Sequence, residues 1–88
     1  MNVKTLGIDL AKNVFRVHGV DSNGRAAVKR QLRRRQVSLF MAQLEPCLVG
    51  MEACGGAHYW AREMVKLGHE VKLMSPRYVR AYVKVEQE

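Results

Sequence analysis

Apolar and polar residues alternate through the first third of the chain, as they do in β-strands with one buried and one exposed face. Three runs show this alternation, over residues 3–9, 14–20 and 25–32. Seven apolar residues on one side of these runs are expected to face the core: Leu6, Ile8, Phe15, Val17, Ala26, Val28 and Leu32. The second and third runs are joined by Asp21-Ser22-Asn23-Gly24, whose Asn-Gly pair is typical of a hairpin turn. Short connections of this kind predict an antiparallel meander.

After residue 36 the apolar spacing changes to the three- and four-residue steps of amphipathic helices. Apolar residues at positions 37, 40, 41 and 44 predict a short helix, which Pro46 ends. An apolar stripe over 57–67 predicts a second helix, and Gly68 is placed to cap it in the left-handed conformation. A third helix is expected from Ser75-Pro76 onward, because serine is a good N-cap and proline suits the first helical position.

Two more strands are predicted between these helices. Residues 47–51 are continuously apolar, which suits a strand covered on both faces, and residues 70–73 alternate again. The predicted order is β-β-β-α-β-α-β-α, with right-handed crossovers leading into two parallel strands. A ribonuclease-H-like domain uses this order for its first five strands, with the first strand central between the second and the fourth. The sequence therefore predicts one α/β unit with a mixed sheet over residues 1–88.

Composition places the chain among small globular proteins. Its 88 residues are 48% hydrophobic and 26% charged, which are ordinary values for a folded domain. No apolar run approaches the roughly 20 residues that span a bilayer, and the first residues lack the layout of a signal peptide. We therefore expect a cytoplasmic chain without a membrane partner. Cys47 and Cys54 are too few for a disulfide scaffold and are expected to be buried and reduced.

A formal net charge of +7 favours an anionic partner, above all nucleic acid. Six basic residues fall between positions 25 and 35 with no acid among them. They form either a ridge that contacts phosphates or a solvated edge that resists aggregation. Nine basic residues are the candidate nucleic-acid contacts: Lys12, Arg25, Lys29, Arg30, Arg33, Arg34, Arg35, Arg77 and Arg80.

Aromatic residues near these charges admit two interpretations. Tyr78 and Tyr82 lie between arginines in a mixture that binds single strands by stacking, although a packed helix explains them equally well. Trp60 belongs to an apolar stripe and is expected in the core. His58 and Tyr59 open the second helix and either face nucleic acid or are ordinary surface residues.

Two acids occupy the ends of predicted strands. Asp9 ends the first and Glu52 ends the fourth. If these strands are parallel neighbours, both carboxylates emerge at one end of the sheet, where they could share a Mg²⁺ ion. No other acid is a natural third ligand. Capping or turn formation at the strand ends is the alternative explanation.

Four segments, residues 7–12, 15–21, 48–60 and 68–76, closely resemble one family of bacterial insertion-sequence proteins. It is the family of DEDD transposases, which have a RuvC-like catalytic domain and are guided by a bridge RNA. The resemblance runs in register from Thr5 to about Lys84, and its most specific blocks are GIDLAK and GMEACGG.

The resemblance implies that Asp9 and Glu52 match the first two acids of the DEDD set and bind Mg²⁺ for phosphodiester chemistry on DNA. It implies DNA and a guide RNA as partners, and a homo-oligomer formed through parts of the family architecture beyond this chain. The family's later acids and its catalytic serine have no counterpart here. We therefore expect an amino-terminal portion, with a RuvC-like fold incomplete at its C-terminus, that holds Mg²⁺ weakly and binds nucleic acid without cleaving it.

Two other classes of protein compete with this interpretation. An actin-like kinase or ATPase also opens with a Gly-Ile-Asp strand, but it follows the aspartate with glycine and a hydroxyl residue, which Leu10-Ala11-Lys12-Asn13 does not supply. A non-catalytic basic module that only binds nucleic acid is the third possibility. A magnesium titration separates it from a metal-binding domain.

Overall fold

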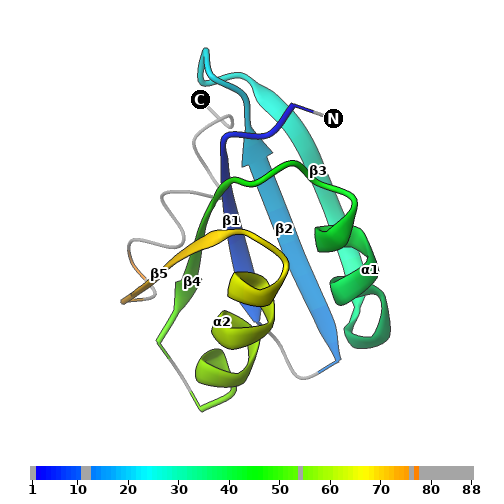
Figure 1. The fold of residues 1–88 in the computed structure, drawn as a ribbon, viewed down its shortest axis with the longest axis vertical. Helices are drawn as coiled ribbons and strands as arrows, with labels where there is room; N and C mark the ends of the chain where they lie inside the picture. Colours follow the sequence, from blue (N-terminus) through cyan, green and yellow to red (C-terminus); the bar gives the residue numbers. More distant parts are fainter. Residues whose placement is uncertain (1, 11–12, 54, 76, 78–88) are drawn as a thin grey trace.

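The computed structural model describes residues 2–10, 13–53, 55–75 and 77 (Figure 1). These residues form five strands, two α-helices and one 3-10 turn. In chain order these are β1 (Thr5–Leu10), β2 (Val14–Val20), β3 (Ala26–Arg33), η1 (Arg34–Gln36), α1 (Val37–Ala42), β4 (Leu48–Glu52), α2 (Ala57–Lys66) and β5 (Glu70–Met74). The third helix that the sequence predicts lies outside the described residues, apart from Arg77.

The strands form a single mixed sheet in the order β3-β2-β1-β4-β5. β2 is antiparallel to both β1 and β3, whereas β4 is parallel to both β1 and β5. β1 is therefore central, between β2 and β4, as the sequence predicts. Since β1, β3, β4 and β5 all run the same way, their C-terminal ends meet along one edge of the sheet, which we call the carboxyl edge.

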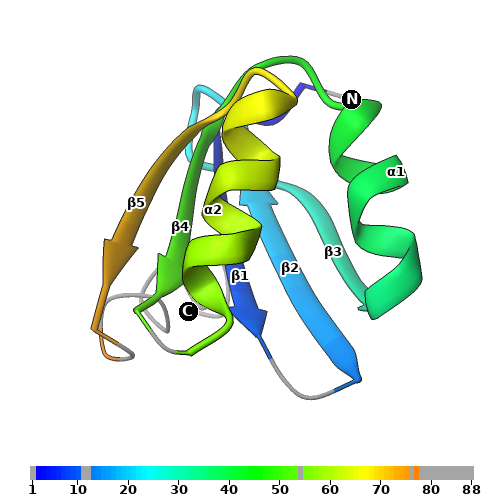
Figure 2. The same cartoon turned by 60° about the horizontal axis from the view of Figure 1, so that its bottom comes forward.

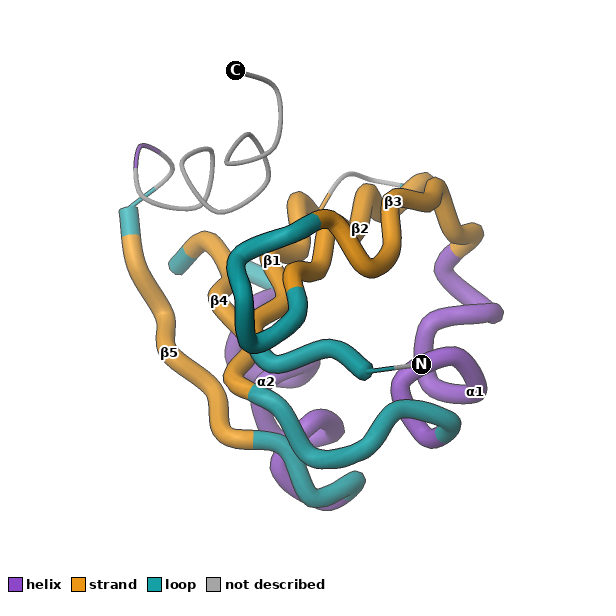
Figure 3. Tube along the Cα trace, turned by 90° about the horizontal axis from the view of Figure 1, so that it is seen from above, coloured by secondary structure: helices purple, strands orange, loops and turns teal. Residues whose placement is uncertain are grey.

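Both α-helices cover the same face of the sheet (Figures 2 and 3). The core lies between this face and the helices, because every second residue of each strand points toward it. Leu6 and Ile8 from β1 and Met51 from β4 are fully buried there, together with Met41 from α1 and Met64 from α2. In the described part of the chain, no helix is long and apolar enough to cross a membrane.

The predicted hairpin turn joins β2 to β3. Asp21 Oδ1 accepts hydrogen bonds from the backbone N–H of Asn23 at 2.9 Å and of Arg25 at 3.0 Å. These bonds, the one from Arg25 first, lower the pKa of the Asp21 carboxyl. Gly24 adopts a φ of 78°, and Gly68 caps α2 with a φ of 95°, so within the described ranges glycine stands at both left-handed positions.

The prediction for Ala26 was wrong, because this residue is exposed. The β2–β3 ladder shifts register between Gly19, which pairs with Val28, and Val20, which pairs with Ala26. Ala27 is the extra residue of this bulge, and it packs against the core in place of Ala26. One added residue therefore reverses the inward and outward pattern at the start of β3.

A buried histidine ties three segments together. The Nδ1 atom of His69 accepts a hydrogen bond from the backbone N–H of Cys47 at 3.1 Å, and its Nε2–H donates to the carbonyl of Met41 at 2.8 Å. The side chain is 4% exposed. Since one nitrogen accepts and the other donates, the ring is held as a neutral tautomer that joins the end of α1, the start of β4 and the α2–β5 turn.

Candidate nucleic-acid interface and acidic pair

Asp9 and Glu52 lie at the C-terminal ends of the neighbouring parallel strands β1 and β4, with Asp9 one residue before the last residue of β1. The paired residues of the β1–β4 ladder end at Ile8 and Met51, and Asp9 and Glu52 are the next residues on the two strands. Ile8 and Met51 face the core, and the alternation of strand residues therefore directs both acids to the opposite face of the sheet. Both residues are half-buried. The geometry that the sequence predicts for this pair of strands is present.

The surroundings of the acidic pair limit what it can bind. Arg16 lies opposite Asp9 in the β1–β2 ladder, and Met74 lies opposite Glu52 in the β4–β5 ladder. Within residues 2–10, 13–53, 55–75 and 77, no group of three or more histidine, cysteine, aspartate or glutamate residues could hold a metal. Two carboxylates still suit Mg²⁺, which often takes one or two protein carboxylates and keeps several waters. The pair therefore offers a donor set for one hydrated ion.

The basic run of residues 25–35 does not form one continuous ridge. Arg25 lies at the hairpin end of β3, and Arg33 lies at its other end, on the carboxyl edge. Between them the strand alternates. Lys29 lies on the face away from the helices, whereas Arg30 lies on the helix side, 5.3 Å from the centre of the Phe40 ring. The periodicity of a strand thus distributes the charges over two faces and two ends.

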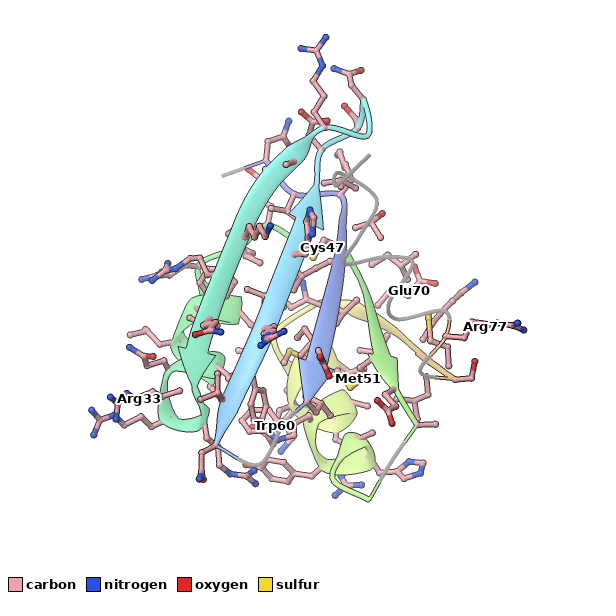
Figure 4. All side chains as sticks on the ribbon, turned by 180° about the vertical axis from the view of Figure 1, so that it is seen from behind. Arg33, Cys47, Met51, Trp60, Glu70 and Arg77 are labelled. Carbon is pink, nitrogen blue, oxygen red and sulfur yellow. The ribbon has the colours of Figure 1, made fainter. Side chains whose placement is uncertain are left out.

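Three arginines gather where β3 meets α1, and we call this set, Arg33, Arg34 and Arg35, the arginine corner. All three are exposed. The backbone N–H of Arg33 donates to Gln36 Oε1 at 2.8 Å, which closes the 3-10 turn and places consecutive arginines outward. Figure 4 shows Arg33 at this end of the sheet, at the same level as Trp60. The arginine corner and the acidic pair therefore share the carboxyl edge.

The remaining candidate contacts are distributed elsewhere. Arg77 is exposed and lies at the opposite side of the sheet from Arg33 (Figure 4). Lys12 and Arg80 lie outside the described residues, as do Tyr78, Tyr82 and Cys54. The structure thus brings together the three residues of the arginine corner and separates them from Arg25 and Arg77.

An open groove of about 1010 Å³ lies beside the arginine corner. Trp60 lines it and is 4% exposed, which confirms the sequence prediction that this residue belongs to the core. Phe15 packs edge-on against Trp60, with ring centres 5.2 Å apart. The Arg34 guanidinium lies 5.5 Å from the Trp60 ring centre, a contact between charge and aromatic face that the sequence pattern did not reveal.

Cys47 is buried, as predicted. Burial raises the pKa of its thiol to about 11, because the charged thiolate loses its hydration. Its sulfur lies 3.6 Å from His69 Nδ1. Cys47 is therefore a buried residue of the core that contacts His69.

The chain is similar in sequence to known proteins that are named transposases. The chain is 58% identical over 84 residues to a Pseudomonas aeruginosa protein named "Probable family 20 transposase". It is 46% identical over 83 residues to the transposase for insertion sequence element IS1328 of Yersinia enterocolitica. It is 41% identical over 83 residues to the transposase for insertion sequence element IS1111A of Coxiella burnetii. All three relatives are named transposases.

The matches cover 96%, 94% and 94% of this chain but 25%, 25% and 23% of the three relatives. The chain therefore spans about a quarter of the length of the curated relatives it matches. No family model matches the chain. The matches span 84, 83 and 83 of the 88 residues of this chain.

Proposed function

We propose that this chain is the amino-terminal part of a ribonuclease-H-like (RuvC-like) catalytic domain of a DEDD insertion-sequence transposase. One observation carries the proposal: Asp9 and Glu52 lie at the C-terminal ends of adjacent parallel strands, and each is the residue after the Ile8–Met51 pair. The central position of β1 in the mixed sheet supports it, and so does the similarity to three transposases. Its reaction class is the metal-dependent cleavage and exchange of phosphodiester bonds during DNA transposition.

In this proposal Asp9 and Glu52 hold Mg²⁺ at the carboxyl edge. The bound ion would polarise the reacting phosphate and stabilise its oxygens. The protein's own residues have separate roles: the two carboxylates fix the ion, and Arg16, opposite Asp9, limits their mutual repulsion. The arginine corner holds the nucleic-acid backbone beside them, since guanidinium groups bind phosphate oxygens in a two-pronged manner.

The isolated chain binds nucleic acid without cleaving it. In-line displacement requires stabilisation of both the attacking and the leaving oxygen, which normally takes more than two carboxylates. Among the described residues, no group of three or more such side chains is brought together. The proposed partners of the complete transposase are DNA, a guide RNA and further copies of itself.

A non-catalytic basic module is the second candidate. The absence of a third metal-binding side chain among the described residues favours it. Under this alternative the arginine corner binds nucleic acid and the acids at the strand ends have no ligand. The two candidates differ in whether metal changes the binding of nucleic acid at the carboxyl edge.

The test measures binding and cleavage together. The chain is mixed with labelled single-stranded, duplex and branched DNA in EDTA, Mg²⁺ or Mn²⁺, beside Asp9→Asn and Glu52→Gln. A matched control is Glu70→Gln, because Glu70 is exposed and lies at the other edge of the sheet. We expect binding without cleavage, and tighter binding in Mg²⁺ that both site variants lose and the control keeps.

Two results would contradict the proposal. If metal changes the nucleic-acid binding of the site variants and of the wild type equally, the two carboxylates hold no ion. The chain is then a non-catalytic module. If the wild type cleaves DNA and Asp9→Asn does not, the chain is a complete nuclease with a ligand among the residues not described here.

A further inference from the structure

We propose that the groove beside the arginine corner binds an unpaired nucleotide, with its base stacked on Tyr59 and its phosphates on Arg33 and Arg35. This inference rests on the part of the proposed function that concerns nucleic acid, and it does not depend on the metal site. It assigns a binding role to Tyr59, whose ring is 48% exposed at the start of α2.

Three aromatic side chains pack against one another in a row that leads from the core to the surface. Phe15 packs edge-on against Trp60 with an interplanar angle of 76°, and Trp60 packs edge-on against Tyr59 at 5.2 Å and 83°. Trp60 is buried and therefore holds the Tyr59 ring in a fixed position. A rigid, exposed ring is a platform for a base, because it loses little conformational entropy on binding.

Exposed apolar surface gathers in this groove. Among the described residues, four large hydrophobic side chains are exposed: Val14, Leu39, Tyr59 and Val65. Two of them, Val14 and Tyr59, line the groove. Duplex recognition through phosphates requires only charge. An apolar surface next to positive charge suits the binding of an unstacked base.

Positive charge borders this apolar surface. Arg34 lies over the Trp60 ring, which leaves Arg33 and Arg35 to contact a ligand. The one ion pair in the described part of the chain joins Lys66 to Glu63, so no described carboxylate neutralises the arginine corner. Among the described residues, no acidic residue lines the groove. The charged side chains of the described lining therefore attract a phosphate.

Uncharged polar side chains complete the lining. Asn13, Gln31 and Gln36 carry amides that both donate and accept hydrogen bonds, and Ser38 adds a hydroxyl. Such groups can bind the edge of a base or a ribose hydroxyl. The groove therefore combines a stacking ring, phosphate-binding cations and hydrogen-bonding groups, the three contacts that a single-stranded nucleotide requires.

The experiment compares single strands with a duplex in EDTA. Anisotropy of a labelled 12-nucleotide DNA, its RNA counterpart and a duplex of the same sequence gives Kd for the wild type and three variants. Tyr59→Ala removes the platform, and Tyr59→Phe keeps it. Val65→Ala is the matched control, since Val65 is 59% exposed on the same helix but lies outside the groove. Circular dichroism checks that each variant is folded.

We expect Tyr59→Ala to weaken single-strand binding by about 5- to 150-fold, the range for loss of one stacked base, and to change duplex binding less than twofold. Tyr59→Phe and Val65→Ala should stay within twofold of the wild type on every ligand. The DNA and RNA arms show which strand the groove prefers. If Tyr59→Ala lost affinity equally for the single strand and the duplex, the inference would be wrong. It would also be wrong if this variant lost no affinity for either ligand.

The outcome is separable from that of the metal experiment. If Tyr59→Ala loses affinity only for single strands in EDTA, the groove is supported as a binding site. This holds even if Asp9→Asn and Glu52→Gln respond to metal as the wild type does. If Tyr59→Ala binds single strands as tightly as the wild type, the groove is not a nucleotide-binding site. This result would not bear on the proposed metal site at Asp9 and Glu52.

Discussion

The hydrogen bonds of His69 allow a stability prediction that can be worked out from the structure. Replacing His69 with Leu keeps most of the side-chain volume but removes both ring nitrogens. The Cys47 N–H then loses its partner, whereas the Met41 carbonyl loses one bond and still accepts from the Leu44 N–H at 3.3 Å. A buried polar group left unpaired costs about 1–3 kcal/mol and the loss of the second hydrogen bond about 0.5–1.5 kcal/mol, so the two together cost about 1.5–4.5 kcal/mol. A chain of 88 residues has a total unfolding free energy of about 4–13 kcal/mol, so the loss would be large.

Urea denaturation measures this loss. Trp60 is the one tryptophan in the sequence and is buried, so its fluorescence reports the unfolding of the core. The midpoint should fall with an unchanged slope, because the surface exposed on unfolding stays the same. His58→Leu is the matched control. His58 is exposed at the start of α2, and its replacement should change stability by less than about 0.5 kcal/mol.

The difference in unfolding free energy between His69→Leu and His58→Leu tests this prediction. If His69→Leu loses less than about 1 kcal/mol relative to His58→Leu, the two bonds do not join α1, β4 and the α2–β5 turn as described. A loss with a much smaller slope would show that the native state has loosened, and the bond energies could not then be assigned.

Three further predictions concern close packing, thiol chemistry and charge. Gly19→Ala should cost about 1–3 kcal/mol in thermal or urea unfolding, because its Cβ would lie 2.7 Å from a Val3 methyl carbon. In a Cys54→Ser background, Cys47 should react with a thiol reagent at pH 8 only as the protein unfolds; with a pKa of about 11, about one thiol in a thousand is ionised. Replacing Arg33 and Arg35 with Gln should lower the log–log salt slope of single-strand binding by about 1.4, at about 0.7 per phosphate contact.

Each of these has a control and a contrary result. Gly55→Ala meets nothing within 4 Å and should be neutral, so an equal loss at both glycines would remove the packing argument. Rapid modification of native Cys47 would show that its burial is transient. Arg62→Gln, on α2 and outside the groove, should keep the wild-type salt slope. An unaltered slope in the corner variant would mean that these arginines are only a solvated edge.

Local periodicity was enough to predict the strands and the two described helices. Alternation identified the inward residues of β1 and β2, and the three- and four-residue steps identified α1 and α2. The expected adjacency of the strands that carry Asp9 and Glu52 came from the strand order of a ribonuclease-H-like domain, in which the first strand lies between the second and the fourth. These features depend on short stretches of chain, so a single sequence contains them.

Features that depend on distant residues were not predictable. The bulge at Ala27 changes the register of two strands, and nothing in a period-two pattern marks the extra residue. His69 reaches partners 22 and 28 residues away, and its spacing carries no signal. The contact of Arg34 with Trp60 requires the 3-10 turn to bring β3 against the start of α2. Tertiary packing, not local propensity, decides all three.

The proposed binding of one divalent ion by Asp9 and Glu52 at the carboxyl edge can be tested by paramagnetic broadening with Mn²⁺. Amide spectra are recorded during titration of the chain, with Asp9→Asn and Glu52→Gln as references. We expect the signals of residues 8–10 and 51–53 to broaden first and together, and both variants to abolish the effect. Broadening centred on other acids, such as Glu45 or Glu63, or no selective broadening in the wild type, would contradict it.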